Sequence, residues 1–127
     1  MTIIHNPDVP NVHTITIAPE MFYARDMCRH YSPDGRAQAL SQLANIIDEK
    51  IIPATTDVKN HAAWVKHRAE LGGCEVVGIN ITKQRWYDCA AGLRNTDIDD
   101  AGAIQDELYN LYNWAYTYGV DIVISEH

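Results

Sequence analysis

Residues 97–125 read DIDDAGAIQDELYNLYNWAYTYGVDIVIS, and this stretch carries local signals for a long helix, its end and a following strand. Asp97 or Asp99 is placed to cap the start of the helix, and Gly119 to end it in the left-handed conformation. Residues 120–125 are mostly apolar, which predicts a buried strand. The apolar positions of the helix form one stripe, which consists of Ile104, Leu108, Leu111, Ala115 and Tyr118.

Four further helices are predicted upstream from apolar spacing, caps and helix-ending residues. Their expected limits are Pro19–Tyr31, Ser32–Pro53, one of residues 55–57 to Gly72-Gly73, and Thr82 onward. The third is expected to bury the stripe Val58, Ala62, Val65 and Ala69. The fourth is expected to bury Trp86, Cys89, Ala90 and Leu93, although residues 85–89 also fit a strand.

Three strands are predicted besides the last one in the chain. Residues 2–5 and 12–17 are rich in β-branched side chains and flank a turn-forming segment, which predicts a β-hairpin. Residues 74–81 form an apolar run that predicts a central strand, parallel to residues 120–125 through a right-handed crossover. The expected fold is therefore α+β, with one domain over residues 1–127 and a small mixed sheet covered by about five helices.

The net charge of −7 is concentrated in the last quarter of the chain. Residues 1–94 contain equal numbers of acidic and basic side chains, whereas residues 95–127 contain no lysine or arginine. The acidic residues of this segment are Asp97, Asp99, Asp100, Asp106, Glu107, Asp121 and Glu126. The balance argues against direct binding of nucleic acid or an anionic membrane through overall charge. The segment either faces solvent, pairs with basic residues of the same fold, or faces a basic partner.

The cysteines and the N-terminal sequence predict a cytoplasmic protein. Residues 1–7 lack the pattern of a secretory signal, and no apolar run is long enough to span a membrane. Cys28, Cys74 and Cys89 are odd in number and have no paired spacing, which is typical of reduced thiols.

No metal site or cofactor is predicted from the histidines and cysteines. His61 and His67 would point about 120° apart on a helix. Asp26 and His30 are four residues apart on the first helix, so they are weak candidates for a catalytic acid–base pair, and the same spacing is more typical of an ordinary surface pair. No nucleophile motif accompanies them. The sequence therefore leaves open whether the protein is an enzyme, and favours a protein without catalytic activity.

Tyrosines form a second stripe on the last helix, at Tyr109, Tyr112 and Tyr116. Tyrosine is typical of interface anchors, but these rings could also pack into the core or over the edge of the sheet. Because the tyrosines and the acidic residues share one segment, we expect a partner-binding surface there. Its predicted residues are Asp97, Asp99, Asp100, Asp106, Glu107, Tyr109, Tyr112 and Tyr116.

The function that the sequence favours is that of a small acidic binding protein, which occupies a basic site on a partner protein such as a nucleic-acid-binding protein or a toxin. In size, acidity and lack of a catalytic motif it resembles phage anti-defence inhibitors and toxin-immunity proteins. The alternative is a small enzyme, or a nucleotide or small-ligand binder, with a site formed between the subunits of a homo-oligomer. An assembly protein of a virus particle is a third hypothesis.

Overall fold

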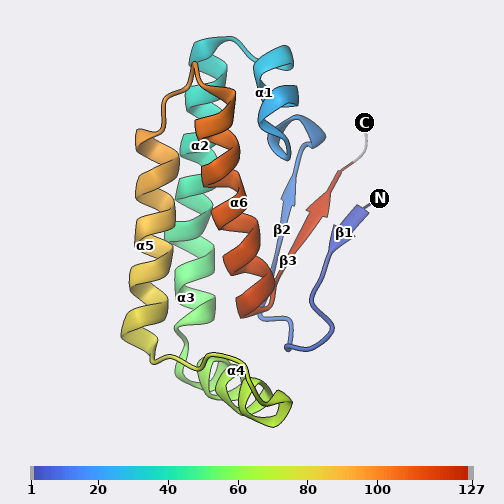
Figure 1. Cartoon of the computed structure of the whole chain (residues 1–127), viewed down its shortest axis with the longest axis vertical. Coiled ribbons are helices and arrows are strands. Elements are labelled where there is room, and N and C mark those ends of the chain that lie inside the picture. Colours follow the sequence, from blue (N-terminus) through green and yellow to red (C-terminus); the bar gives the residue numbers. More distant parts are fainter. Residues whose placement is uncertain (1, 126–127) are drawn as a thin grey trace.

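The computed structural model describes residues 2–125, and its strands form a mixed three-stranded sheet with helices against one face (Figure 1). The strands are β1 (Thr2–Ile4), β2 (His13–Ile17) and β3 (Val120–Ile124), in the order β1-β3-β2. The central strand β3 runs antiparallel to β1 and parallel to β2. This arrangement confirms the predicted α+β class and the small mixed sheet. Glu126 of the acidic segment lies outside the described residues.

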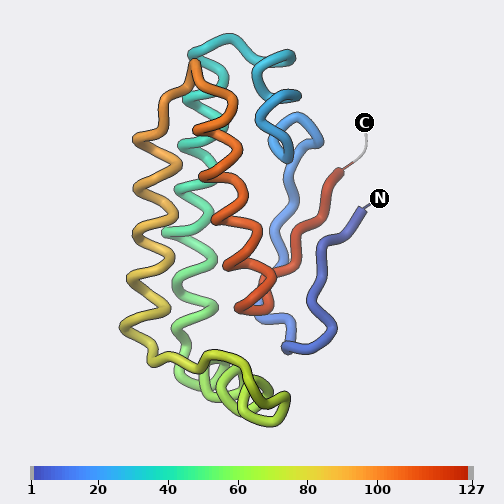
Figure 2. The backbone as a smooth tube through the Cα atoms, viewed as in Figure 1, coloured from blue at the N-terminus to red at the C-terminus, as the bar shows by residue number. Residues whose placement is uncertain are grey.

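The helices form a layer beside the sheet, and α4 lies across one end of this helical layer (Figure 2). Two short elements interrupt the series, a 3₁₀ turn η1 and a π-helical turn η2. The elements between β2 and β3 are η1 (Pro19–Met21), α1 (Ala24–His30), α2 (Pro33–Ile46), η2 (Ile47–Ile51), α3 (Ile52–Thr55), α4 (Val58–Leu71), α5 (Ile79–Asn95) and α6 (Ala101–Tyr118). No helix among residues 2–125 is long and apolar enough to cross a membrane.

The predicted apolar stripe of α6 forms the centre of the core. All five of its residues, Ile104, Leu108, Leu111, Ala115 and Tyr118, are buried. They pack in one cluster with Ile15 and Ile122 from the sheet and with Leu40 and Leu43 from α2. Full burial of a large aliphatic side chain contributes about 1.5–3 kcal/mol, so Ile104, Leu108 and Leu111 each contribute on this order.

Local signals at the helix ends are largely confirmed. The Ser32 hydroxyl accepts from the backbone N–H of Gly35, and the Asp57 carboxylate caps α4. Gly119 ends α6 at φ +79°, in the left-handed region. The predicted cap of α6 was wrong by one residue, because the Asp100 carboxylate, and not that of Asp97 or Asp99, accepts from the first turn.

The predicted hairpin is wrong, because β3 lies between β1 and β2. The connection between these strands passes around the turn that joins α6 to β3. The side-chain amide of Asn6 donates to the carbonyl of Tyr116, and the backbone N–H of Val12 donates to that of Gly119. Residues 6–11 therefore hold β1 and β2 apart by the width of one strand.

The predicted strand at residues 74–81 is also wrong. Residues 74–78 form an extended loop, and α5 begins at Ile79. Both sides of β3 are already occupied by β1 and β2, and Val76 and Ile81 are exposed. The parallel partner of residues 120–124 is therefore β2, near the start of the chain.

Three predicted helices differ in detail. The first is divided into η1 and α1. Pro53 does not end the second, because the π-helical turn η2 precedes it and the helix continues into α3. In α4, the buried residues are His61 and Trp64, whereas Val58 is 73% exposed, so the predicted apolar stripe is not the packed face. The buried stripe predicted for α5 is confirmed.

Candidate functional site

The side of α6 opposite its core stripe is a polar and aromatic surface, which we call the outer α6 face. It consists of Asp106, Tyr109, Asn113 and Tyr116, which are all exposed. Tyr109 is 65% exposed and Tyr116 is 46% exposed. The two rings are seven residues apart, about two helical turns, so they lie on the same side of the helix. In Figure 1, α6 runs in front of α2.

Tyr112, the third predicted tyrosine, has a different environment. Its hydroxyl donates to the carbonyl oxygens of Met21 and Phe22, at 3.1 and 2.5 Å. Its ring stacks on that of Phe22 with the centroids 4.6 Å apart. Burial is the larger cause that raises the pKa of the Tyr112 hydroxyl above its ordinary value, and the neighbouring Tyr23 raises it further. Tyr112 therefore links α6 to the start of α1 and is not an exposed anchor.

Residues 97–100 form a turn at the start of α6, which we call the acidic turn. Asp97 accepts from the backbone N–H of Asp99 and thereby fixes the turn, and Asp100 caps the helix. Asp99 is 3.3 Å from the Arg36 guanidinium, which also donates to the carbonyl of Tyr31. The acidic turn is thus attached to the junction of α1 and α2.

Few basic residues of the fold pair with the carboxylates of the acidic segment, residues 95–127 of the sequence. Among residues 2–125, the pair with Arg36 is the one ion pair that an arginine or lysine makes with this segment. The other arginine pairs use Asp48 and Glu75. The carboxylates of the segment that make no ion pair in the described part of the chain are those of Asp97, Asp100, Asp106 and Glu107.

Glu107 faces α5 and not the outer α6 face. Its carboxylate lies over Gly92, in the space that a Cβ there would occupy. Burial, together with the charge of Glu107, raises the pKa of the Cys89 thiol to about 12. Of the predicted binding residues, the structure therefore brings Asp106, Tyr109 and Tyr116 together, places the acidic turn at the end of the same helix, and directs Tyr112 and Glu107 toward neighbouring helices.

The predicted acid–base pair in α1 does not form. No hydrogen bond or ion pair joins Asp26 and His30 in the described structure, and His30 is exposed. Asp26 instead lines a cavity of about 390 Å³ between α1 and the sheet. Residues four apart on a helix are close enough to interact, but here the two side chains have separate environments.

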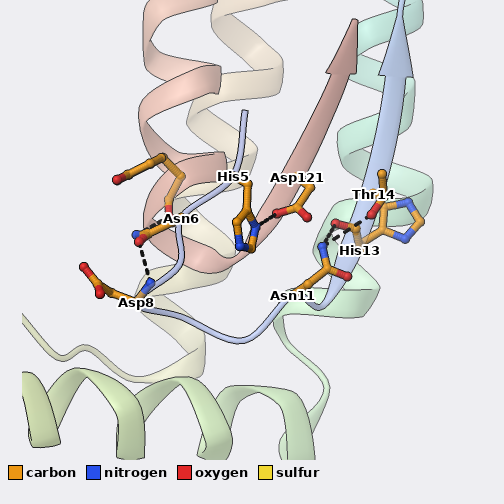
Figure 3. Close-up of polar contacts among 8 residues, drawn as sticks. His5, Asn6, Asp8, Asn11, His13, Thr14 and Asp121 are labelled. Atoms are coloured by element: carbon orange, nitrogen blue, oxygen red, sulfur yellow. Dashed lines mark hydrogen bonds and ion pairs between the residues drawn. The ribbon is translucent and has the colours of Figure 1, made fainter. Parts of the chain in front are cut away.

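A carboxylate–imidazole pair does form on the open face of the sheet (Figure 3). Nδ1 of His5 lies 2.9 Å from the carboxylate of Asp121, and Thr14 occupies the next position across the sheet. Such a pair orients an imidazole for proton transfer. None of the described cavities includes these residues. Sequence reasoning missed the pair because it depends on β1 pairing with β3, 116 residues away.

A buried hydrogen-bonded chain joins α4, α5 and α6. Nε2 of His61 is 3.3 Å from the Thr82 hydroxyl, which is 3.2 Å from the Tyr118 hydroxyl. Arg85 donates to the Tyr118 oxygen and to Glu75, both at 3.0 Å, and its guanidinium lies over the ring of Trp114. Burial lowers the pKa of His61, which favours the neutral imidazole. The chain satisfies polar groups inside the helical layer, and the apolar patterns of the sequence carry no signal for it.

Within residues 2–125, no group of three histidine, cysteine, aspartate or glutamate side chains is arranged to hold a metal ion. Comparison of the chain with models of known protein families, with curated proteins and with solved structures returned no match.

Proposed function

We propose that the protein is a binding protein that occupies a basic site on a partner protein through the outer α6 face and the acidic turn. The observation that carries this proposal is the exposure of Tyr109 and Tyr116 beside Asp106, on a helix whose opposite side is fully packed. A nucleic-acid-binding protein or a toxin with a cationic groove is the kind of partner that such a surface fits.

The two tyrosines suit the role of anchors because their backbone is rigid. Tyrosine has few rotatable bonds, so an exposed ring on a packed helix loses little conformational entropy when it binds. Each ring offers a large apolar area and a hydroxyl group, the combination that is enriched at interface hot spots.

The uncompensated carboxylates favour a basic partner over a neutral one. Asp97, Asp100 and Asp106 form no ion pair with the described residues, so their charge is available to a partner. Exposed carboxylates act over a Debye length of about 8 Å at physiological ionic strength, and mainly accelerate association. We therefore expect affinity to fall as salt concentration rises.

The test compares Tyr109→Ala/Tyr116→Ala with the wild-type protein. Proteins captured from the natural host cells are identified by mass spectrometry, and the Kd of the purified partner is measured at 50 and 500 mM NaCl. We expect the double substitution to weaken binding more than tenfold, since each hot-spot residue contributes about 2 kcal/mol. Wild-type binding should also weaken at high salt.

Tyr87→Ala is the matched control for the anchors. Tyr87 is as exposed as Tyr116 but lies on α5, so its substitution should leave the Kd unchanged. Equal binding by the wild type and the Tyr109→Ala/Tyr116→Ala variant would contradict the proposal, as would binding that is insensitive to salt.

A catalytic function is the second candidate, and the His5–Asp121 pair is the observation that favours it. The pair lies on the open sheet face, so a second copy of the chain would have to complete the site. Native mass spectrometry tests this idea: a homo-oligomer carrying a bound metabolite, and lost on His5→Asn substitution, would support it, whereas a monomer would count against it.

A further inference from the structure

The cavity of about 390 Å³ lies between the edge of the sheet and the start of α1. Its volume is within the range of about 300–1,000 Å³ that is typical of small-ligand sites. Most of its described lining is apolar, and Asp26 is the one carboxylate among the described residues. The lining residues are Thr2, Ile4, Pro19, Phe22, Tyr23, Asp26 and Ile124. It shares no residue with the outer α6 face or the acidic turn.

Two aromatic rings form a corner of this cavity. The rings of Phe22 and Tyr23 are nearly perpendicular, at 84°, with their centroids 4.7 Å apart. Phe22 is fixed from behind by its stacking on Tyr112, whose hydroxyl is hydrogen-bonded to the backbone of the same turn. Tyr23 also lines the cavity and is 55% exposed. The corner is thus braced on one side and open to solvent on the other.

The carboxylate of Asp26 has no partner in the described structure. It is half-buried, and no hydrogen bond or ion pair from residues 2–125 reaches it. Arg25 and Arg29 flank it in α1, but both are exposed and neither pairs with it. A carboxylate withdrawn from water beside apolar walls is unfavourable unless a cation or hydrogen-bond donor accompanies it. Within residues 2–125, no positive charge is paired with the carboxylate that lines this cavity.

We infer that this cavity binds an organic cation, an ammonium or guanidinium group on an alkyl stem. The charged group would lie between Asp26 and the faces of Phe22 and Tyr23, since cations within about 6 Å of an aromatic ring are attracted to it. The alkyl stem would pack on Ile4 and Ile124. The lining favours an organic cation over a hard metal ion, because among the described residues Asp26 supplies the one carboxylate and the aromatic and aliphatic walls offer no ligand to a hydrated metal ion.

The test is an NMR titration of the ¹⁵N-labelled protein with n-butylammonium and n-butylguanidinium, and with butan-1-ol as the neutral analogue. We expect saturable shifts of the amide signals of Tyr23, Asp26 and Ile124 with both cations and none with the alcohol. Asp26→Asn keeps the shape of the side chain and removes its charge, and should weaken binding at least tenfold. Tyr23→Leu should weaken it several-fold.

Asp106→Asn is the control, because it removes a carboxylate from the outer α6 face and leaves the cavity intact. It should not change the affinity for either cation. Thermal unfolding of each variant verifies that the fold is kept. Equal binding to the wild type and Asp26→Asn, or shifts that map to residues outside the cavity, would overturn the inference.

A further titration, with Nα-acetyl-lysine N-methylamide, distinguishes the source of the cation. Tighter binding of this compound than of n-butylammonium would identify a lysine side chain of a protein as the occupant, and weaker binding a free amine; both outcomes keep the cation site. Failure of the cation titrations leaves the binding role of α6 unaffected, because the two sites have no residue in common.

Discussion

His61 is a buried titratable residue, so its charge state bears on the stability of the fold. It is 6% exposed, and its ring forms a hydrogen bond with the neutral hydroxyl of Thr82. The ring of Trp64 lies 5.3 Å away, and the nearest cation of the hydrogen-bonded chain, Arg85, lies beyond Tyr118. A proton on His61 would therefore bring a charge into the helical layer, where none of the described carboxylates forms an ion pair with it.

We predict that the free energy of unfolding falls as the pH falls below about 6.5, the ordinary pKa of histidine. Burial lowers the pKa of His61 in the folded chain, so the unfolded chain takes up the proton first. The loss is at most about 1.4 kcal/mol per pH unit and stops below the lowered pKa. Urea unfolding at pH 7.5, 6.5 and 5.5 measures it.

His61→Gln should remove this part of the pH dependence, even if it lowers stability at every pH. His67→Gln, on the exposed side of the same helix, should retain it. A slope that is the same in the wild type and His61→Gln would show that other groups are responsible.

The junction of α6 and β3 connects the two elements that hold the core together. Gly119 has φ +79°, and a Cβ there would overlap the carbonyl oxygen of Pro10. The same glycine carbonyl accepts from Val12, which positions β2 beside β3. Gly119 thus ends α6 directly before β3, and its lack of a side chain allows the connection between β1 and β2 to pass close to its backbone.

We predict that Gly119→Ala lowers the free energy of unfolding by about 2–4 kcal/mol, from left-handed backbone strain and from the overlap with Pro10. Gly73→Ala is the control, because Gly73 also has a positive φ, of +69°, and no atom within 4 Å of its Cβ position. It should cost about 1 kcal/mol, from the strain alone. Chemical denaturation measures both, and equal losses would show that the approach to Pro10 is unimportant.

The elements that the sequence predicts correctly are those set by neighbouring residues. The core stripe of α6, the cap at Ser32 and the glycine end at Gly119 depend on spacing and on local hydrogen bonds. Strand pairing does not depend on neighbouring residues alone. Two β-branched runs that flank a turn predict a hairpin, whereas in the structure β3, from the other end of the chain, lies between the two strands. An apolar run such as residues 74–81 likewise contains no information on whether a sheet edge is free to accept it.

The candidate site divides in the same way. Helical spacing correctly groups Tyr109 with Tyr116, but Tyr112 lies nearer the side on which α1 packs, and that packing is a long-range contact. The cavity at Asp26 and the His5–Asp121 pair depend equally on where the two ends of the chain meet. Their chemistry could not be predicted before the topology was known.

At the scale of the whole molecule, the chain closes on itself because its last strand is the middle of the sheet. β3 lies between two strands from the first 17 residues, so both edges of the sheet depend on contacts that span the chain (Figure 2). Contacts between residues so far apart in the sequence form slowly, so we expect the sheet to close after the local helices of the layer beside it. In contrast, α4 lies across the far end of this layer and is held through few side chains.

The contacts that hold α4 come mainly from Trp64 and His61. The indole N–H of Trp64 donates to the carbonyl of Thr117 at 2.7 Å, and His61 reaches Thr82. Beyond the helix, residues 72–73 and 75–76 are exposed. Elements with few buried contacts open at a lower free energy than the core, so α4 should be able to unfold while the sheet and α6 remain intact.

We therefore predict two classes of amide in native-state hydrogen exchange. The free energy of opening should be at least 2 kcal/mol lower for the amides of α4 than for those of β3 and the centre of α6, which exchange only on global unfolding. Trp64→Phe removes the bond to Thr117 and should accelerate exchange in α4 at least fivefold, since a lost hydrogen bond costs about 1 kcal/mol. It should affect β3 much less. If α4 and β3 exchange with the same free energy in the wild type, the molecule opens as one cooperative unit and α4 is part of its core.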